Sequence, residues 1–277
     1  MAIQLDKRDV LDGLFGCWDD IDELLAGLSD EQWKAPTALP GWRVHDVVSH
    51  IVGTESFLMG VPTPTPDCDV SALPHVNNDL GVMNECWVRH LYDEPPAAML
   101  ERFRSVTAER RKTLLAMDDD AWNENTTTPV GPETYGRFMR IRTFDCWMHE
   151  QDIRYAVGVW ATDEKVAAAP ARHSLAEITA ALGRTVGKLG KAPDGSLVAF
   201  ELTGPLQRTL RVAVEGGRGR VVDEFEDGPT TTIQLDAVLF ARLAGGRTTA
   251  AENMEAIEIS GDVGLGRQVA ERLTFVM

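Results

Sequence analysis

The sequence contains little of several features, and each shortage narrows the class of protein. Its four cysteines are scattered and form no CxxC pair, so we expect reduced thiols. No window approaches 18 uncharged apolar residues, so we predict no membrane-spanning helix. The first residues, MAIQLDKRDVLDGLF, lack the apolar core and the cleavage site of a signal peptide. We therefore expect a cytoplasmic protein.

Positive charge is also scarce. The chain has 27 Lys and Arg against 43 Asp and Glu, and its formal net charge is −16. Such an acidic chain is a poor partner for a nucleic-acid backbone or an anionic membrane, so we predict neither as a partner. The remaining composition is that of a globular protein, with 44% hydrophobic and 25% charged residues. A length of 277 residues suits one large domain or two smaller ones.

The first half of the sequence has the periodicity of helices. Residues 9–28 repeat apolar side chains at three- and four-residue spacing, which predicts an amphipathic helix that ends near Gly27. Ser29 and Gln32 are a capping-box pair for a short turn. The same periodicity predicts further helices over 44–60, 76–92, 97–117 and 137–157. The segments between them are rich in Pro, Gly or polar residues and predict loops at 35–42, 61–74 and 118–136. Long helices in this number suit an up-and-down bundle, which places its chemistry between facing helices.

The second half changes character. Residues 173–190 predict a helix, and alternating apolar and polar residues then predict strands at 197–204, 209–217, 219–225 and 231–236. A helix at 236–246 and a strand, turn and helix over 256–273 follow. The predicted fold class is therefore a helical bundle over residues 1–160 and a smaller α+β domain with an antiparallel sheet over 173–277. The Ala- and Pro-containing stretch 161–172 is the predicted boundary.

Three residues from two predicted helices could meet as metal ligands. Asp145 and His149 are four residues apart, so they lie on one helix face and could hold a divalent metal, although an ordinary surface pair has the same spacing. His50 lies mid-helix beside Val47 and Ile51, where a hydrogen-bonded core histidine is the alternative. Inward residues of different helices meet inside a bundle. Together the three would supply nitrogen and oxygen ligands and leave an open position, as in a catalytic zinc site.

Two motifs also carry a family resemblance. GWRVHDVVSHIVGTE (41–55) and RTFDCWMHEQDIRYAVG (142–158) resemble the N-terminal domain of the mycothiol-dependent maleylpyruvate isomerase family, a DinB-like metal-binding four-helix bundle. DEQWKAPTALPGW (30–42) matches the family's tryptophan-containing loop, and the C-terminal LFARLAGGRTTAAE and IEISGDVGLGRQVAERL resemble its sterol-carrier-protein-like second domain. The resemblance implies His50, Asp145 and His149 as the metal ligands. Asp145 stands where the isomerase has a glutamate.

The resemblance also implies a chemistry. In the family the metal, expected to be zinc, activates the small thiol mycothiol, because a bound metal lowers the pKa of a thiol. The thiolate can then add to an electrophilic small molecule. Addition followed by elimination isomerises a cis double bond, whereas addition alone transfers the thiol. The expected partners are therefore mycothiol as cosubstrate and a small electrophile, and a homodimer is a further expectation.

Several other residues are candidates for this site. The resemblance places on Arg247, in LAGGRTT, the family's arginine for a substrate carboxylate, with a solvated loop arginine as the alternative. We predict that Trp42 and Arg154 contribute to cofactor binding. Trp42 and Trp147 could line the pocket mouth, although core packing is the commoner role of tryptophan in a bundle. Asp152 could orient a ligand histidine, but we expect it to form a helix-surface ion pair with Arg154.

The reaction is left open by the residues themselves. Aspartate is one methylene shorter than glutamate, so Asp145 would hold a metal closer to its own helix or through a water.

Glu55 and His45 could reach the rim of the pocket. Cys146 points away from the face of Asp145 and receives no redox role. An S-transferase and an isomerase are both consistent with these residues; the alternatives are a non-catalytic metal-containing binding protein and a metal-dependent hydrolase.

Overall fold

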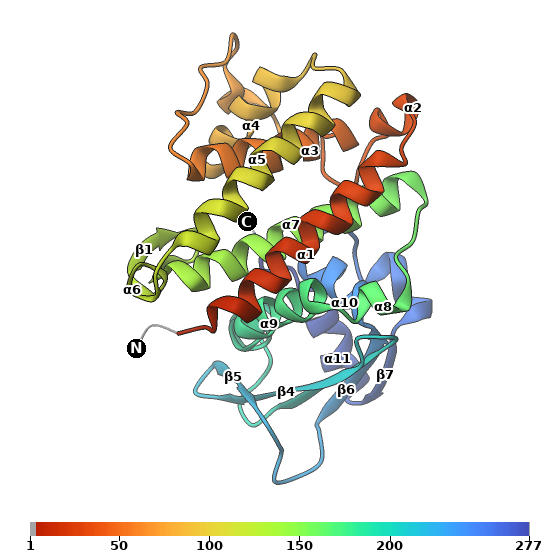
Figure 1. Cartoon of the computed structure of the whole chain (residues 1–277). Helices are drawn as coiled ribbons and strands as arrows, with labels where there is room; N and C mark the ends of the chain where they lie inside the picture. The colour runs from red at the N-terminus through yellow and green to blue at the C-terminus, as the bar shows by residue number, and fades with distance from the viewer. Residues whose placement is uncertain (1–3, 277) are drawn as a thin grey trace. The chain divides into compact units, whose positions relative to one another are not determined.

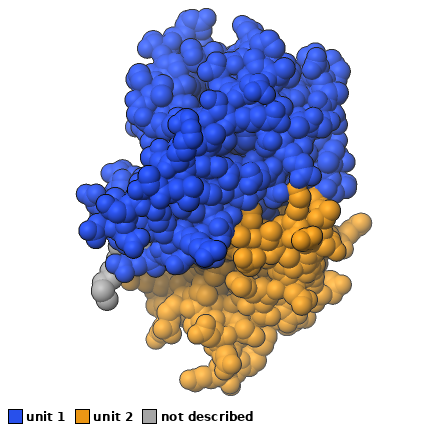
Figure 2. Space-filling view, viewed as in Figure 1, with its two compact units in different colours: residues 1–160 blue, residues 161–277 orange. Residues whose placement is uncertain are grey.

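The chain divides into two compact units, Met1–Trp160 and Ala161–Met277, which Figure 2 shows in different colours. The computed structural model describes residues 4–276. The first unit is almost entirely helical, and the second combines helices with a five-stranded sheet. This confirms the predicted fold class. No helix among the described residues is long and apolar enough to cross a membrane.

The first unit is built around five long helices (Figure 1). These are α1 (Lys7–Ala26), α3 (Val44–Leu58), α4 (Asp79–Leu91), α5 (Pro96–Ala116) and α7 (Tyr135–Val157). The short elements between them are α2 (Asp30–Trp33), η1 (Val70–Ala72), α6 (Asp119–Asn123), β1 (Asn125–Thr128) and β2 (Gly131–Thr134). The predicted capping box is confirmed. Ser29 and Gln32 exchange the two hydrogen bonds of a capping box, and Gly158 ends α7 in the left-handed conformation.

The order of the helices around the bundle differs from an up-and-down arrangement. Helix α1 packs mainly against α7 and α5, and α3 packs against α5, α7 and α4. The bundle therefore runs α1, α7, α3, α5 around its core, and consecutive helices α1 and α3 are not main neighbours. The reason lies in the long connections 27–43 and 117–134, which let the chain cross the bundle between adjacent elements. This order makes α3 and α7 neighbours, which positions the candidate site.

The segment 118–136 is more regular than the predicted loop. It contains helix α6 and an antiparallel hairpin of β1 and β2, in which Asn125 pairs with Thr134 and Thr128 with Gly131. Its polar composition hid this structure, but β-branched threonines favour extended backbone and a glycine at positive φ closes the turn. The hairpin leads directly into α7.

The second unit is a five-stranded sheet with helices packed against it (Figure 1). The strand order is β5-β4-β3-β6-β7. The strands are β3 (Leu197–Thr203), β4 (Arg208–Glu215), β5 (Arg218–Val222), β6 (Thr231–Asp236) and β7 (Glu258–Gly261). The helical segments are α8 (Asp163–Val166), α9 (Ala169–Arg184), η2 (Thr185–Leu189), α10 (Ala237–Ala244), η3 (Ala251–Ala256) and α11 (Val263–Ala270). Alternate residues of β4, such as Leu210, Val212 and Val214, are buried, as their sequence pattern predicts.

One strand pair departs from the predicted antiparallel pattern. Strands β3 and β6 run parallel, with Phe200 opposite Ile233, while the other three pairs of the sheet are antiparallel. The cause is the segment 223–230, which carries the chain from edge strand β5 to the far side of β3. Alternation of apolar residues reports burial of one face and not strand direction, so the sequence could not distinguish the two cases.

Close packing of α9 on β5 requires glycine at the point of contact. A Cβ atom on Gly183 of α9 would lie 2.4 Å from the carbonyl oxygen of Gly219 in β5. No side chain fits there without moving backbone. The glycines therefore fix how closely α9 approaches the edge of the sheet.

Candidate metal centre

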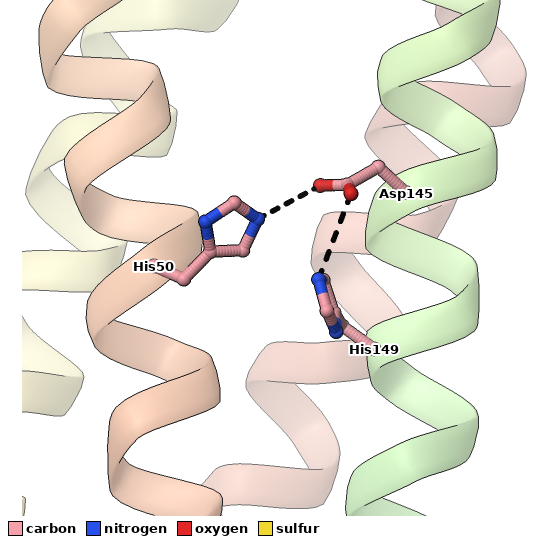
Figure 3. A group of neighbouring side chains, drawn as sticks. All are labelled: His50, Asp145 and His149. Atoms are coloured by element: carbon pink, nitrogen blue, oxygen red, sulfur yellow. Dashed lines mark hydrogen bonds and ion pairs between the residues drawn. The ribbon is translucent and has the colours of Figure 1, made fainter. Parts of the chain in front are cut away.

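The candidate site lies between α3 and α7, which pack against each other in the bundle. His50 comes from the middle of α3, and Asp145 and His149 come from successive turns of α7. Figure 3 shows the three side chains pointing toward one another across the gap between the two helices. The four-residue spacing on α7 and the neighbouring position of α3 together produce this cluster.

The distances between the three side chains are short. His50 Nε2 lies 3.1 Å from Asp145 Oδ2, and His149 Nε2 lies 3.6 Å from Asp145 Oδ1. One ligand atom from each residue lies within 4.8 Å of the others. Both histidines are 5% exposed, whereas the side chain of Asp145 is 31% exposed. The cluster is therefore buried on the histidine sides and reaches solvent at Asp145.

These atoms fit a divalent metal. Zinc ligands lie at about 2.0–2.2 Å from the ion, so two ligands of a tetrahedral site are separated by about 3.3 Å. The separations of 3.1 and 3.6 Å between the histidine nitrogens and Asp145 lie on either side of that value. Two imidazoles and one carboxylate are also the donor types of catalytic zinc sites, in which a fourth position stays open.

A neighbouring carboxylate fixes the orientation of His149. The Nδ1 atom of His149 lies 3.1 Å from Asp152 Oδ2, and the side chain of Asp152 is fully buried. When Nδ1–H donates to this carboxylate, the Nε2 lone pair is directed at Asp145. On α3, Thr54 Oγ1 lies 3.5 Å from Nδ1 of His50. The Nε2 atom of the same ring faces Asp145. Partners of this kind orient metal ligands.

The expected ion pair between Asp152 and Arg154 is wrong. Residues two apart on a helix point in different directions, whereas residues three or four apart share a face. Asp152 therefore meets His149, and Arg154 Nε donates instead to Glu150 at 2.7 Å. Arg154 also donates to the carbonyl of Val159. The role of Arg154 in cofactor binding stays a prediction.

A buried ionic network supports Asp145. Arg142 donates from NH1 to Asp145 Oδ2, and from Nε and NH2 to Glu55 Oε1 at 3.0 and 2.9 Å. Arg110 Nε donates to the second oxygen of Glu55 at 2.9 Å. Glu55 is fully buried and does not take the rim position that the sequence left open. An acid on the buried face of α3 needs these guanidinium partners, because an unpaired charge there is very unfavourable.

The charges of the cluster suit metal binding. Burial works to raise the pKa of Asp145, but Arg142, His149 and His50 outweigh burial and hold that pKa well below its ordinary value. Burial lowers the pKa of His50, although Asp145 opposes this change. At neutral pH Asp145 is therefore a carboxylate and His50 a neutral imidazole. These are the protonation states in which both residues bind a metal.

The two tryptophans near the motifs have different positions. The Trp42 ring lies 5.4 Å from the His50 ring and 6.3 Å from the His149 ring, and its indole N–H donates to the buried Glu85 at 2.9 Å. Trp147 is buried in the core. Trp42 is thus placed against the cluster, as a lining residue would be, whereas Trp147 has the alternative role that the sequence left open.

The remaining candidates, His45, Cys146 and Arg247, are not members of the three-residue cluster. His45 is buried, and its Nε2 bonds to the carbonyl of Glu94 at 2.8 Å, so the structure does not place it at a pocket rim. Burial raises the pKa of Cys146 to about 12, and its thiol is thus neutral. Arg247 belongs to the second unit, where it is half-buried and donates to the carbonyl of Gly245 at 2.6 Å. Its role in substrate binding stays a prediction.

Sequence reasoning missed the network of Arg142, Arg110 and Glu55. One signal was present in the sequence. Arg110 falls on the same helix face as Met99 and Phe103, which are core residues. A charged residue at such a position implies a buried partner of opposite charge.

Comparisons with known proteins give the family. Residues 14–154 match the model of the mycothiol maleylpyruvate isomerase N-terminal domain, and residues 172–268 match that of the MDMPI C-terminal domain. The chain belongs to the mycothiol maleylpyruvate isomerase family. Both family domains occur in their expected order, and the resemblance stated from the two sequence motifs is thereby confirmed.

Individual relatives are distant. Two proteins of Mycobacterium tuberculosis, from strains CDC 1551 / Oshkosh and H37Rv, are each described as uncharacterized and are 25% identical over 221 residues. That match covers 78% of this chain and 75% of each relative. The crystal structure of a mycothiol-dependent maleylpyruvate isomerase is similar with a TM-score of 0.61 at 16% identity. It covers 94% of this chain and 95% of its own, and a point mutant of the isomerase gives 0.60 with the same identity and coverage. At this identity the likeness shows the fold alone.

Proposed function

We propose that the chain is a metal-dependent enzyme that activates the thiol mycothiol. The activated thiol is either transferred to an electrophilic small molecule or catalyses the cis–trans isomerisation of that molecule. His50, Asp145 and His149 are the proposed ligands of a divalent metal, with zinc as the first candidate. The observation that carries the proposal is a three-donor cluster that is buried at both histidines and exposed to solvent at Asp145. Three protein ligands leave a position for a thiol.

The side chains around the cluster have distinct roles in this proposal. A divalent metal, when bound, would lower the pKa of a coordinated thiol so that the thiolate nucleophile forms at neutral pH. Asp152 holds His149 with Nε2 directed into the site, and Thr54 lies at the corresponding nitrogen of His50. The Trp42 ring lies 5.4 Å from the His50 ring and 6.3 Å from the His149 ring, where it could contact a bound thiol. Both histidines thus direct Nε2 toward Asp145.

Whether the enzyme catalyses S-transfer or isomerisation depends on residues outside the three-residue cluster. We propose that residues 1–160 form the metal-binding domain and residues 173–277 the second domain, in which Arg247 recognises a carboxylate of the electrophile. Isomerisation requires addition, bond rotation and elimination within one site, whereas S-transfer ends after addition. Asp145 is one methylene shorter than a glutamate, and the proposal includes both S-transfer and isomerisation.

Calorimetric titration with mycothiol tests this function. We expect the zinc-loaded chain to bind mycothiol and to release about one proton, because a metal-bound thiol is deprotonated. The proton is measured from the dependence of the binding enthalpy on the ionisation enthalpy of the buffer. The matched ligand is S-methyl mycothiol, which keeps the sugar and lacks the ionisable thiol. Equal binding of both ligands, or equal binding to zinc-loaded and zinc-free chain, would contradict the proposal.

A further inference from the structure

Arg142 connects the candidate metal centre to a buried carboxylate that lies outside it. It precedes Asp145 by one helical turn on α7, and its guanidinium is nearly fully buried. The fork of this side chain is divided between two acids. Its Nε and NH2 groups donate to Glu55 Oε1, and NH1 donates to Asp145 Oδ2. A planar guanidinium fixes the direction of each of these hydrogen bonds.

Glu55 is itself held in place. Its second oxygen accepts from Arg110 Nε at 2.9 Å, and Arg110 NH2 donates to the Tyr135 hydroxyl at 3.2 Å. Glu55 lies on α3 five residues after His50, and Arg110 lies on α5. The Glu55 carboxylate is therefore held by its own helix α3 and by Arg110 of α5, and Arg142 of α7 is its third attachment. Arg142 consequently ties the helix that carries His50 to the helix that carries Asp145.

The Asp145 side chain depends on a hydrogen bond for its orientation more than the two histidines do. Each histidine is buried, and His149 is fixed by Asp152, whereas the Asp145 side chain is 31% exposed and faces both imidazoles. A carboxylate free to rotate would satisfy one histidine and lose the other. The hydrogen bond from Arg142 to Oδ2 holds that oxygen 3.1 Å from His50 and leaves Oδ1 toward His149.

We propose that Arg142 is a positioning residue that uses Glu55 as a fixed support to orient the Asp145 carboxylate for metal binding. This inference rests on the proposed metal centre and adds the device that sets its geometry. Arg142 touches no reacting group, and its effect passes through Asp145. A lysine at this position keeps the charge but cannot reach both acids with a rigid fork.

The chain offers a matched control in Arg110. Both arginines bind Glu55, and both are buried, but Arg110 bonds to Tyr135 where Arg142 bonds to Asp145. Arg142→Lys alters the bond to Asp145, whereas Arg110→Lys alters only contacts outside the cluster and leaves Glu55 bonded to Arg142. Arg142→Gln and Arg110→Gln form a second pair in case one lysine variant does not fold. Folding is followed by tryptophan fluorescence, since all seven tryptophans lie in the first unit.

The readouts are the affinity for cobalt(II) and its visible absorption, which reports the ligand geometry. We expect Arg142→Lys to lose about 10- to 100-fold in cobalt affinity, as changes at residues that orient metal ligands do, and to alter the spectrum. Arg110→Lys should keep the wild-type spectrum and affinity. Equal losses in both folded variants, or an unchanged Arg142 variant, would overturn the positioning role while the metal centre stands. A wild-type chain that binds no cobalt would instead overturn the metal centre and this inference with it.

Discussion

Replacing either ligand histidine by alanine should abolish stoichiometric metal binding. Wild-type chain is expected to retain about one equivalent of a divalent metal, and His50→Ala or His149→Ala to retain almost none. A change to a residue that only orients a ligand costs about 10- to 100-fold in affinity, and removal of one of three ligands costs more. Elemental analysis of purified protein after dialysis against metal-free buffer measures this directly.

His45 provides the control for these two variants. It lies on α3 with His50 and has the same 5% exposure, but its ring bonds to the carbonyl of Glu94 and not to Asp145. His45→Ala therefore removes an equally buried imidazole from the same helix and should keep the full metal content. If His45→Ala loses as much metal as His50→Ala, the loss reflects damage to α3 and not removal of a ligand.

Glu55→Gln should destabilise the first unit strongly. The substitution keeps the size of the side chain but removes the negative charge that Arg110 and Arg142 share in a fully buried position. Removing one partner of a buried ion pair costs about 3–5 kcal/mol, because the remaining charge is left uncompensated. Urea unfolding followed by tryptophan fluorescence reports this unit, since the second unit contains no tryptophan.

The comparison for this stability loss is an exposed ion pair. Glu31 pairs with Lys34 at 2.9 Å on the surface, where both side chains are largely exposed. Glu31→Gln should leave the unfolding midpoint nearly unchanged, because water and salt screen such pairs. A Glu55→Gln midpoint as high as that of Glu31→Gln would show that the buried network contributes little to the fold.

The sequence was sufficient for the long helices of the first unit and for the pair of Asp145 and His149. Periodicity of three and four residues places the long helices, and the spacing of Asp145 and His149 puts them on one face of α7. The membership of His50 depended on a second helix, whose neighbour cannot be derived from local periodicity. The family resemblance supplied that pairing, and the contact of α3 with α7 explains it.

The residues that contact the cluster could not be predicted from the local sequence pattern. Arg142 meets Glu55 across 87 positions of sequence, and Glu85 receives the Trp42 indole across 43. Such contacts follow from the order of helices in the bundle, which the sequence pattern predicted wrongly as up-and-down. Asp152 is a different case, because helical spacing alone favours His149 over Arg154 as its partner.

In the proposed function, Asp145 is the residue on which the choice of reaction depends most. It is the acidic member of the cluster, it is exposed enough to meet a ligand, and Arg142 fixes one of its oxygens. A glutamate, which the family resemblance implies at this place, would hold the ligand oxygen on an arm one methylene longer. The arginine bond gives the shorter aspartate a defined direction, and the proposed centre keeps three ligands despite the change.

The most direct test of the account is to add mycothiol to the cobalt-loaded chain. A thiolate that binds cobalt(II) gives a charge-transfer absorption band in the near ultraviolet, which neither the free metal nor the three protein ligands produce. We predict that this band appears with mycothiol, reaches its maximum at about one thiol per metal, and is absent in His149→Ala. Cobalt bound to the wild-type chain with no new band at saturating mycothiol would contradict an open metal position that takes the thiol.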